Sequence, residues 1–110
     1  MSMPAKTTEV FEYLKRCASE MRTVKYGEIG KETNVAPIGI GSQLGYIRDH
    51  VCREKGLPWL NAIAVSGTKE WRPGKGFLPG DHQIPEKDEE RLWRGMVLQV
   101  FAFDWSQVTL

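Results

Sequence analysis

The sequence predicts an α+β fold, a winged-helix-like helix-turn-helix with a small β element and a C-terminal helix. Three observations carry this prediction. A helical apolar pattern over residues 7–21 is followed by a short helical piece, a turn and a third helical pattern. A run with β-branched residues comes next, and a long helical pattern that starts with acidic residues closes the chain. The length of 110 residues fits a single domain over residues 1–110.

The first helix is expected to begin near Thr7, because Thr7 or Thr8 can cap its N-terminus. Its apolar residues recur at spacings of three and four, which predicts one buried stripe. Charged residues fill the positions between them, as is typical of a helix at the surface of a core. The expected stripe consists of Val10, Phe11, Leu14, Cys17, Ala18 and Met21.

A short second helix is predicted over residues 26–33, with Ile29 facing inward. Asn34 suits a left-handed residue that ends this helix. Residues 35–39 indicate a turn, because Pro37 disfavours a helical residue before it.

A third helix is expected over residues 40–55, and Gly56 is its C-terminal stop. Helix, short helix, turn and helix is the order of a helix-turn-helix unit. The expected apolar face of the third helix consists of Ile40, Leu44, Ile47 and Val51.

The second half of the chain contains the small β element and the last helix. Residues 59–66 are predicted to form a strand, residues 67–68 a turn and residues 69–72 a return strand. Residues 73–80 are rich in glycine and proline and are not regular structure throughout. Residues 85–103 predict a helix with acidic residues in its first turn. The apolar face of that helix consists of Leu92, Trp93, Met96, Val97, Val100 and Phe101.

The composition is that of an ordinary globular chain, with 41% hydrophobic and 26% charged residues. No stretch approaches the roughly 18 to 20 consecutive apolar residues that span a bilayer. The start of the chain lacks the apolar run of a secretory signal. We therefore expect a cytoplasmic protein without a membrane partner. The net charge of +1 predicts that any DNA binding rests on few phosphate contacts.

Patterns typical of catalysis or metal binding are missing from the sequence. Cys17 and Cys52 lack metal-type spacing; we expect Cys17 in the core, Cys52 partly exposed, and no disulfide. His50 and His82 have no second ligand at zinc spacing. Residues 74–76 lack the spacing of a phosphate-binding loop. We therefore expect no enzymatic activity, no metal and no cofactor.

The start of the third helix carries the candidate base readers. In a helix-turn-helix, the N-terminal part of the second helix of the unit enters the major groove. Ser42 and Gln43 are polar residues of types that hydrogen-bond bases or phosphates, and Arg48 follows further along the helix. The nearby glycines either let the backbone approach a phosphate or permit tight helix packing, and the sequence leaves both readings open.

A candidate wing lies in the segment 69–75. Cations with an interleaved aromatic residue suit a sugar-phosphate backbone or an unstacked base. The alternative is a solvated loop whose aromatic residue folds back on the core. The cations are Lys69, Arg72 and Lys75, and the aromatic residue is Trp71.

Three segments follow one another in a familiar order: Lys25-Tyr26-Gly27-Glu28-Ile29, Ile40-Gly41-Ser42-Gln43-Leu44-Gly45 and Leu57-Pro58-Trp59-Leu60-Asn61-Ala62-Ile63. Their order and approximate spacing resemble the DNA-binding domain of the O6-alkylguanine DNA alkyltransferases, and particularly the alkyltransferase-like proteins. The resemblance covers about residues 8–67.

This resemblance implies roles for single residues. Tyr26 matches the family tyrosine that presses on a phosphate while a damaged nucleotide rotates out of the stack. Trp59 stands where alkyltransferases have their methyl-accepting cysteine, and Trp59 and Asn61 would line the pocket for the flipped base. Leu60-Asn61 replaces the family's His-Arg, and Ile38 stands in place of a family arginine. The resemblance thus implies DNA binding without alkyl transfer.

Residues 57–77 are also similar to phage and bacterial proteins for which no function is known to us. From the residues and the first resemblance, we predict a non-catalytic protein that binds double-stranded DNA. Exchange of Gln43 and Arg48 together is expected to abolish that binding while leaving the fold intact.

Two other hypotheses stay open. One is a protein-interaction module or mobile-element accessory factor without DNA binding; the near-neutral charge, the expected exposure of Trp71 and Phe77, and the terminal Trp105 favour it. The other is an enzyme subunit whose site another chain completes, with His82 beside Asp81 as its candidate residue.

Overall fold

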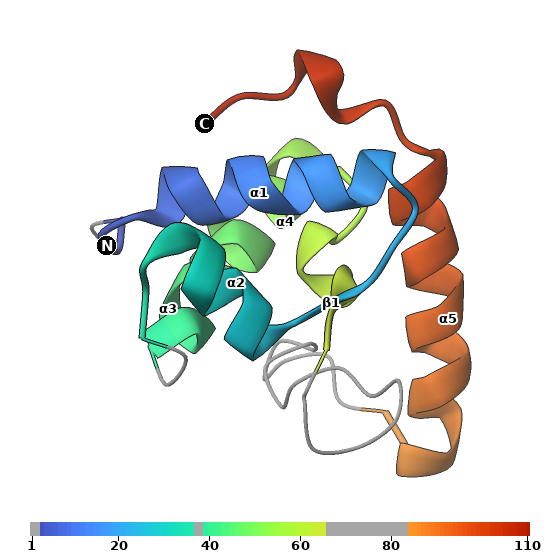
Figure 1. The fold of residues 1–110 in the computed structure, drawn as a ribbon. Helices are drawn as coiled ribbons and strands as arrows, with labels where there is room; N and C mark the ends of the chain where they lie inside the picture. The colour runs from blue at the N-terminus through green and yellow to red at the C-terminus, as the bar shows by residue number, and fades with distance from the viewer. Residues whose placement is uncertain (1–2, 37–38, 66–83) are drawn as a thin grey trace.

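The computed structural model describes residues 3–36, 39–65 and 84–110. It is mostly helical, with one small two-stranded parallel sheet (Figure 1). The α+β class is therefore confirmed in its coarse form. The expected wing, the return strand at residues 69–72 and the glycine- and proline-rich segment at residues 73–80 lie outside the described residues.

Helix α1 (Thr7–Ser19) forms where the apolar periodicity predicts it. The predicted cap is wrong, because Lys6 is the N-cap residue and the Thr7 hydroxyl donates to the carbonyl of Pro4 at 2.6 Å. Met21 is 69% exposed, because the helix has ended and the backbone there is left-handed, with φ 53°. The rest of the predicted stripe is buried, namely Val10, Phe11, Leu14, Cys17 and Ala18.

Helix α2 (Tyr26–Thr33) has the predicted bounds, and Ile29 is buried as expected. Asn34 ends the helix in a left-handed conformation, with φ 59° and ψ 41°. The Nζ atom of Lys6 donates to the carbonyl of Thr33 at 3.3 Å. A cation is favourable at this position, because the free carbonyls at a helix C-terminus carry partial negative charge.

The predicted third helix is continuous over residues 40–55, but its type changes along the way. It consists of α3 (Ile40–Tyr46), the π-helical η2 (Ile47–Cys52) and α4 (Arg53–Lys55). A short π-helical insertion widens the turn and occurs often at functional sites. Gly56 ends this continuous helix, which we call the rod, in a left-handed conformation, with φ 66°. The predicted apolar face is buried, namely Ile40, Leu44, Ile47 and Val51.

Replacing Gly56 by alanine is expected to destabilise the protein by about 1 to 2 kcal/mol, because a Cβ is strained at φ 66°. Gly41→Ala is the matched control. It is expected to stabilise the protein by about 0.5 to 1 kcal/mol, since a Cβ on this helical residue meets nothing within 4 Å. Urea denaturation measures both effects. Equal stability of the two variants would contradict the left-handed stop at Gly56.

The strand predicted over residues 59–66 does not form as such. Leu60–Ile63 is a 3-10 helix, η3, and within the described part of this run a strand, β2, forms at Ala64–Val65. Strand β2 pairs in parallel with β1 (Val24–Lys25), with Val24 opposite Ala64. All four side chains of η3 are buried. A strand would turn every second side chain to the opposite face, so a helical turn accommodates this run better.

Helix α5 (Glu86–Ala102) confirms the predicted C-terminal helix to within one residue at each end. After it the chain turns back, and η4 (Trp105–Gln107) places Trp105 in the core. The Nε1 atom of Trp105 donates to the carbonyl of Val100 at 2.9 Å. Trp105 is therefore a core residue, because both its ring and its N–H have partners inside the fold.

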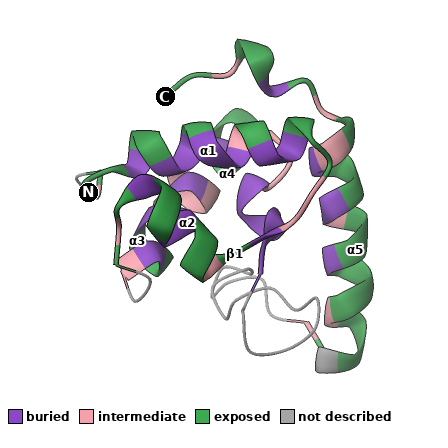
Figure 2. Ribbon diagram, viewed as in Figure 1, coloured by how far each residue is buried: buried purple, intermediate pink, exposed green. Residues whose placement is uncertain are grey.

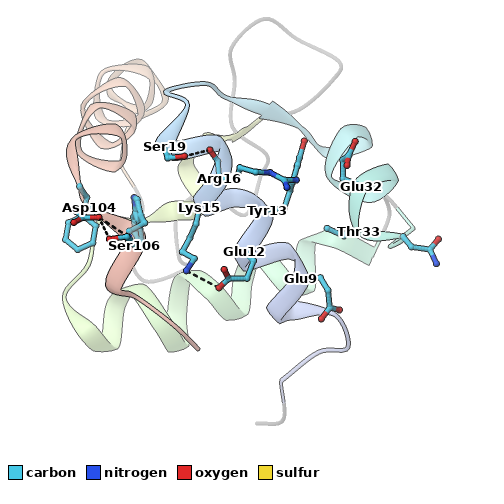
Figure 3. A pocket seen from close by; sticks show the side chains of 13 residues that line it. Glu9, Glu12, Tyr13, Lys15, Arg16, Ser19, Glu32, Thr33, Asp104 and Ser106 are labelled. Atoms are coloured by element: carbon cyan, nitrogen blue, oxygen red, sulfur yellow. Dashed lines mark hydrogen bonds and ion pairs between the residues drawn. The ribbon is translucent and has the colours of Figure 1, made fainter.

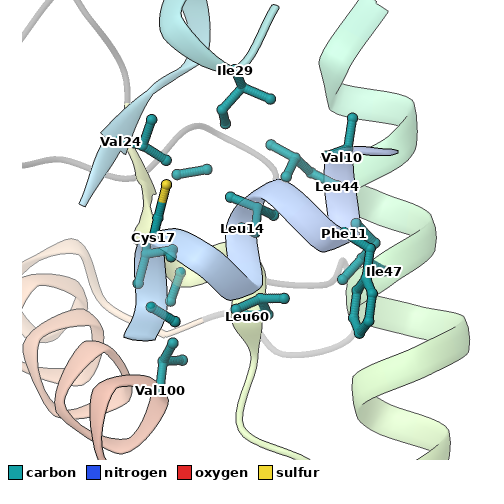
Figure 4. Packing of buried hydrophobic residues seen from close by; sticks show 14 of the residues in the cluster. Val10, Phe11, Leu14, Cys17, Val24, Ile29, Leu44, Ile47, Leu60 and Val100 are labelled. Atoms are coloured by element: carbon teal, nitrogen blue, oxygen red, sulfur yellow. The ribbon is translucent and has the colours of Figure 1, made fainter. Parts of the chain in front are cut away.

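The core lies where α1 meets the other helices (Figure 2). Figure 4 shows Phe11 and Leu14 from α1 beside Ile29 from α2, Ile47 from η2 and Leu60 from η3. Residues from distant parts of the sequence thus share one cluster, and this cluster fixes α2 and α3 relative to the rest of the chain.

Both cysteines are buried free thiols. The prediction for Cys17 is confirmed, whereas the partial exposure expected for Cys52 is wrong, because the π-helical turn directs that side chain into the core. In the part of the chain that the structure describes, no helix has the length and apolar character needed to cross a membrane.

Candidate nucleic-acid interface

Helices α2 and α3 are the two helices of the predicted helix-turn-helix unit, and the N-terminal segment of the chain contacts both of them. The Nε2 atom of Gln43, near the start of α3, donates to the carbonyl of Ala5 at 2.9 Å. The next residue, Lys6, bonds the carbonyl of Thr33 at the end of α2. One short segment therefore holds both helices of the unit in place.

Gln43 was predicted to read bases, but the structure places it in the protein interior. Its side chain is only 6% exposed, and its amide is engaged by Ala5. Gln43 follows Ile40 by three residues and precedes Ile47 by four, so it lies on the apolar face of the helix. That spacing is a signal in the sequence for its burial. Substituting both Gln43 and Arg48 is thus expected to destabilise the fold, whereas the sequence alone led us to expect an intact fold.

The outward face of α3 is formed by small residues. Gly41 and Ser42 are exposed, and Gly45 is half-buried. A Cβ at Gly41 would meet nothing within 4 Å, so the surface there is open. The Ser42 hydroxyl donates to the carbonyl of Gly39 at 2.9 Å and contacts Oε1 of Gln43 at 3.2 Å. We call Gly41, Ser42 and Gly45 the α3 face.

Arg48 lies beside the α3 face, and its guanidinium is hydrogen-bonded to the carboxylate of Asp49. Its Nε and Nη2 atoms donate to the two oxygens of Asp49 at 2.8 Å and 2.7 Å. The guanidinium also approaches Gly45, where a Cβ would lie 4.0 Å from Nη2 of Arg48. The hydrogen bonds from Arg48 hold the pKa of Asp49 below its usual range, so Asp49 is charged at neutral pH.

Tyr26 is the first residue of α2 and is half-buried against the core. Burial raises the pKa of its hydroxyl, which therefore stays neutral and can donate a hydrogen bond. Lys25 and Lys31 are exposed on either side of it in the sequence. This end of the molecule thus offers a phenol and two lysines at the start and along the exposed side of α2.

Trp59 and Asn61 are the two residues that the resemblance assigns to a base pocket. Trp59 is half-buried and packs against the core, and Asn61 is 4% exposed in η3. Asn61 is therefore placed among core residues. The cationic residues of the candidate wing, Lys69, Arg72 and Lys75, lie outside the described residues, as does His82.

A separate groove of about 830 Å³ runs along the exposed side of α1 (Figure 3). The end of α2 and the segment 103–106 border it. Its charges are of both signs, and Lys15 pairs with Glu12 at 3.0 Å. None of the predicted site residues that the structure describes lines this groove. Among the described residues, no three His, Cys, Asp or Glu side chains form a group that could hold a metal ion.

Comparison of the chain with family models, with curated proteins and with solved structures gives no match. The contacts of α2 and α3 are therefore what bears on its function.

Proposed function

We propose that this protein is a non-catalytic binder of double-stranded DNA, with α3 as the helix that enters a groove. The observation that carries the proposal is the α3 face, which is open to solvent at the start of the second helix of the predicted helix-turn-helix unit. This is the part of such a unit that contacts base edges. Small residues at this place allow the helix backbone to approach the nucleic acid closely.

Ser42 is the residue of the α3 face that can form specific hydrogen bonds. Its hydroxyl is exposed, and a hydroxyl can both donate to and accept from a base edge or a phosphate. Gly41 and Gly45 flank it at the same side of the helix and add no bulk. Ser42 therefore takes the base-reading position in this proposal, in place of the buried Gln43.

Few cationic side chains lie where they could contact phosphates, in keeping with the net charge of +1. Lys25 and Lys31 are exposed near α2, and the guanidinium of Arg48 lies against Gly45. With about two to four phosphate contacts, log K is expected to fall with log salt at a slope of roughly −2 to −4. Binding is thus expected to be readily measurable only at low salt.

Ser42→Asp is expected to weaken duplex binding about 10-fold or more, because a carboxylate on the α3 face repels the DNA backbone. An acidic residue in the first turn of a helix is favourable, so the fold should be retained. Gln99→Glu, which adds the same charge on the exposed side of α5, is the matched control and should change the affinity less than 3-fold. Fluorescence anisotropy with a labelled duplex at about 50 mM salt measures both.

Two outcomes would contradict this proposal. If wild-type protein at low salt binds no duplex, whether intact, mismatched or alkylated, DNA binding is not its function. If Ser42→Asp and Gln99→Glu weaken binding equally, DNA is bound through another surface than the α3 face.

The resemblance to alkyltransferase-like proteins supports a narrower form of the proposal. In that form a base rotates out of the duplex towards Trp59 and Asn61, and the neutral Tyr26 hydroxyl contacts a phosphate. A duplex with 2-aminopurine at the target position reports unstacking as a rise in fluorescence. An unchanged signal at saturating protein would contradict base flipping and leave duplex binding intact.

A protein-interaction role is the second candidate, and one observation favours it. Leu98 on α5 is 68% exposed, and Leu92 is 36% exposed. A cavity of about 450 Å³ lies on this helix and is lined by Trp93, Arg94, Val97 and Leu98. Exposed apolar side chains beside a cavity are typical of surfaces that bind another protein. The buried position of Trp105 removes one of the residues that favoured this reading from sequence.

A further inference from the structure

Arg48 and Asp49 are adjacent in the chain, and their side chains contact each other directly. Side chains at successive positions of an α-helix do not face each other. Here both residues lie in the π-helical η2, and the guanidinium meets the carboxylate through two hydrogen bonds of 2.8 Å and 2.7 Å. The Arg48 side chain is 14% exposed and that of Asp49 is 33% exposed. The pair is therefore partly shielded from water and from salt.

A second cation shares the same carboxylate. The Nη1 atom of Arg53, one turn further along the rod, lies 3.4 Å from Oδ1 of Asp49. Asp49 thus sits between two guanidinium groups. A single carboxylate offsets much of the positive charge that this side of the rod would otherwise present.

The location of this cluster links it to the α3 face. The Nη2 atom of Arg48 lies 4.0 Å from the place of a Cβ at Gly45, so the guanidinium runs back along the helix towards Ser42. A DNA strand that reaches the α3 face would bring its phosphates close to Asp49. The carboxylate would repel them, while the two arginines would attract them.

The chemistry of the two anions is closely similar. The fork of a guanidinium binds two oxygens of a carboxylate or two oxygens of a phosphate by parallel hydrogen bonds. The edge of Arg48 formed by Nε and Nη2 is the edge that would take a backbone phosphate, and Asp49 occupies it.

Building on the proposed DNA binding, we propose that Asp49 is an internal competitor of the DNA backbone, displaced from Arg48 and Arg53 by a phosphate when duplex DNA docks on the α3 face. The two arginines are then available to DNA only once the α3 face is engaged. A loosely placed duplex meets a cluster in which Asp49 cancels the charge of one of the two arginines, and it is held more weakly than by two free guanidinium groups. Asp49 thus suppresses non-specific binding relative to the docked complex.

The test is Asp49→Asn, which removes the charge and keeps the shape of the side chain. It is expected to tighten duplex binding about 10-fold at 100 mM salt and to steepen the log–log salt slope by about 1 to 2, as expected for one or two added phosphate contacts. Fluorescence anisotropy over a salt series measures both quantities. The additional exchange Arg48→Met in the Asp49→Asn background should remove most of the gain.

Glu54→Gln is the matched control, because it removes the same charge from the same rod. Glu54 lies near His50, with Nδ1 and Oε1 3.6 Å apart, and forms no ion pair with an arginine among the described contacts. It is expected to change the affinity less than 3-fold and to leave the salt slope unchanged. If Asp49→Asn lowers the thermal midpoint too far for binding measurements, Asp49→Ser replaces it.

The outcomes separate the two proposals. If wild-type protein binds DNA and Asp49→Asn binds no more tightly than Glu54→Gln, Asp49 supports the arginines instead of competing for them, and this inference is overturned. If neither wild type nor Asp49→Asn binds any duplex, the proposed function itself has failed, and the inference fails with it. A gain specific to Asp49→Asn that depends on Arg48 supports both.

Discussion

Replacing Trp93 by alanine is expected to lower the free energy of unfolding by about 3 to 5 kcal/mol, because it removes a large buried side chain and leaves a cavity. Trp93 is 4% exposed and fills the space between α5 and η3, where its Nε1 atom donates to the carbonyl of Ala62 at 2.7 Å. A loss of that size is a large part of the roughly 5 to 15 kcal/mol that stabilises an ordinary domain.

Two further variants separate packing from hydrogen bonding. Trp93→Phe keeps an aromatic ring but lacks the N–H, and we expect it to lose about 1 to 3 kcal/mol. Leu98→Ala removes an exposed side chain of the same helix and should change stability by less than about 0.5 kcal/mol. Urea denaturation at pH 7 measures all three. If Trp93→Ala costs no more than Leu98→Ala, α5 is not packed on the core as described.

The second large effect is a loss of stability at high pH. Burial and the hydrogen bond to Glu28 raise the pKa of Tyr13 to about 12, and burial raises the pKa of Cys52 to about 11. Between the ordinary pKa values of these groups and the raised ones, the folded chain keeps protons that the unfolded chain releases. Stability therefore falls as pH rises, starting near pH 9 for Cys52 and near pH 10 for Tyr13.

The fall due to Tyr13 between pH 10 and pH 12 is expected to be about 1 to 2 kcal/mol, because solvent screens part of the interaction at its hydroxyl. Tyr13→Phe removes the loss of stability that comes from ionisation of Tyr13, and it should flatten the pH dependence above pH 10. The same variant also lowers stability at neutral pH, because it lacks the hydrogen bond to Glu28. Cys52→Ala should instead remove the part that begins near pH 9. Urea midpoints over pH 7 to 12 distinguish the two. An unchanged slope above pH 10 in Tyr13→Phe would show that Tyr13 is not held neutral by the fold.

Helix positions were predictable from this sequence because their signals are local. The spacing of Val10, Phe11 and Leu14 indicates one face of α1, and Asn34 and Gly56 end their helices in the left-handed conformation predicted for them. These features depend on backbone geometry within a few residues. The run Leu60–Ile63 misled the strand prediction, because Ile63, a β-branched residue, lies in a buried 3-10 turn instead of a strand.

The site was less predictable, because it depends on which side chains meet. Ser42 was expected on an exposed helix face and is there. Gln43 was expected on the same exposed face because of its residue type, although its spacing from Ile40 and Ile47 indicates burial. Asp49 was overlooked, although the pair Asp49 and Arg53, four residues apart, is a known signal for an ion pair on a helix.

By itself, the sequence determined where the main helices lie and that Asn34 and Gly56 end two of them. These follow from local propensity and from the periodic burial of apolar residues. Only the tertiary structure decided that the backbone of Ala5 engages Gln43, that residues 47–52 are π-helical, and that Arg48 bonds Asp49 there. Hydrogen bonds between residues far apart, and a change of helix type in mid-rod, arise from packing against the whole core and have no local signature in the chain.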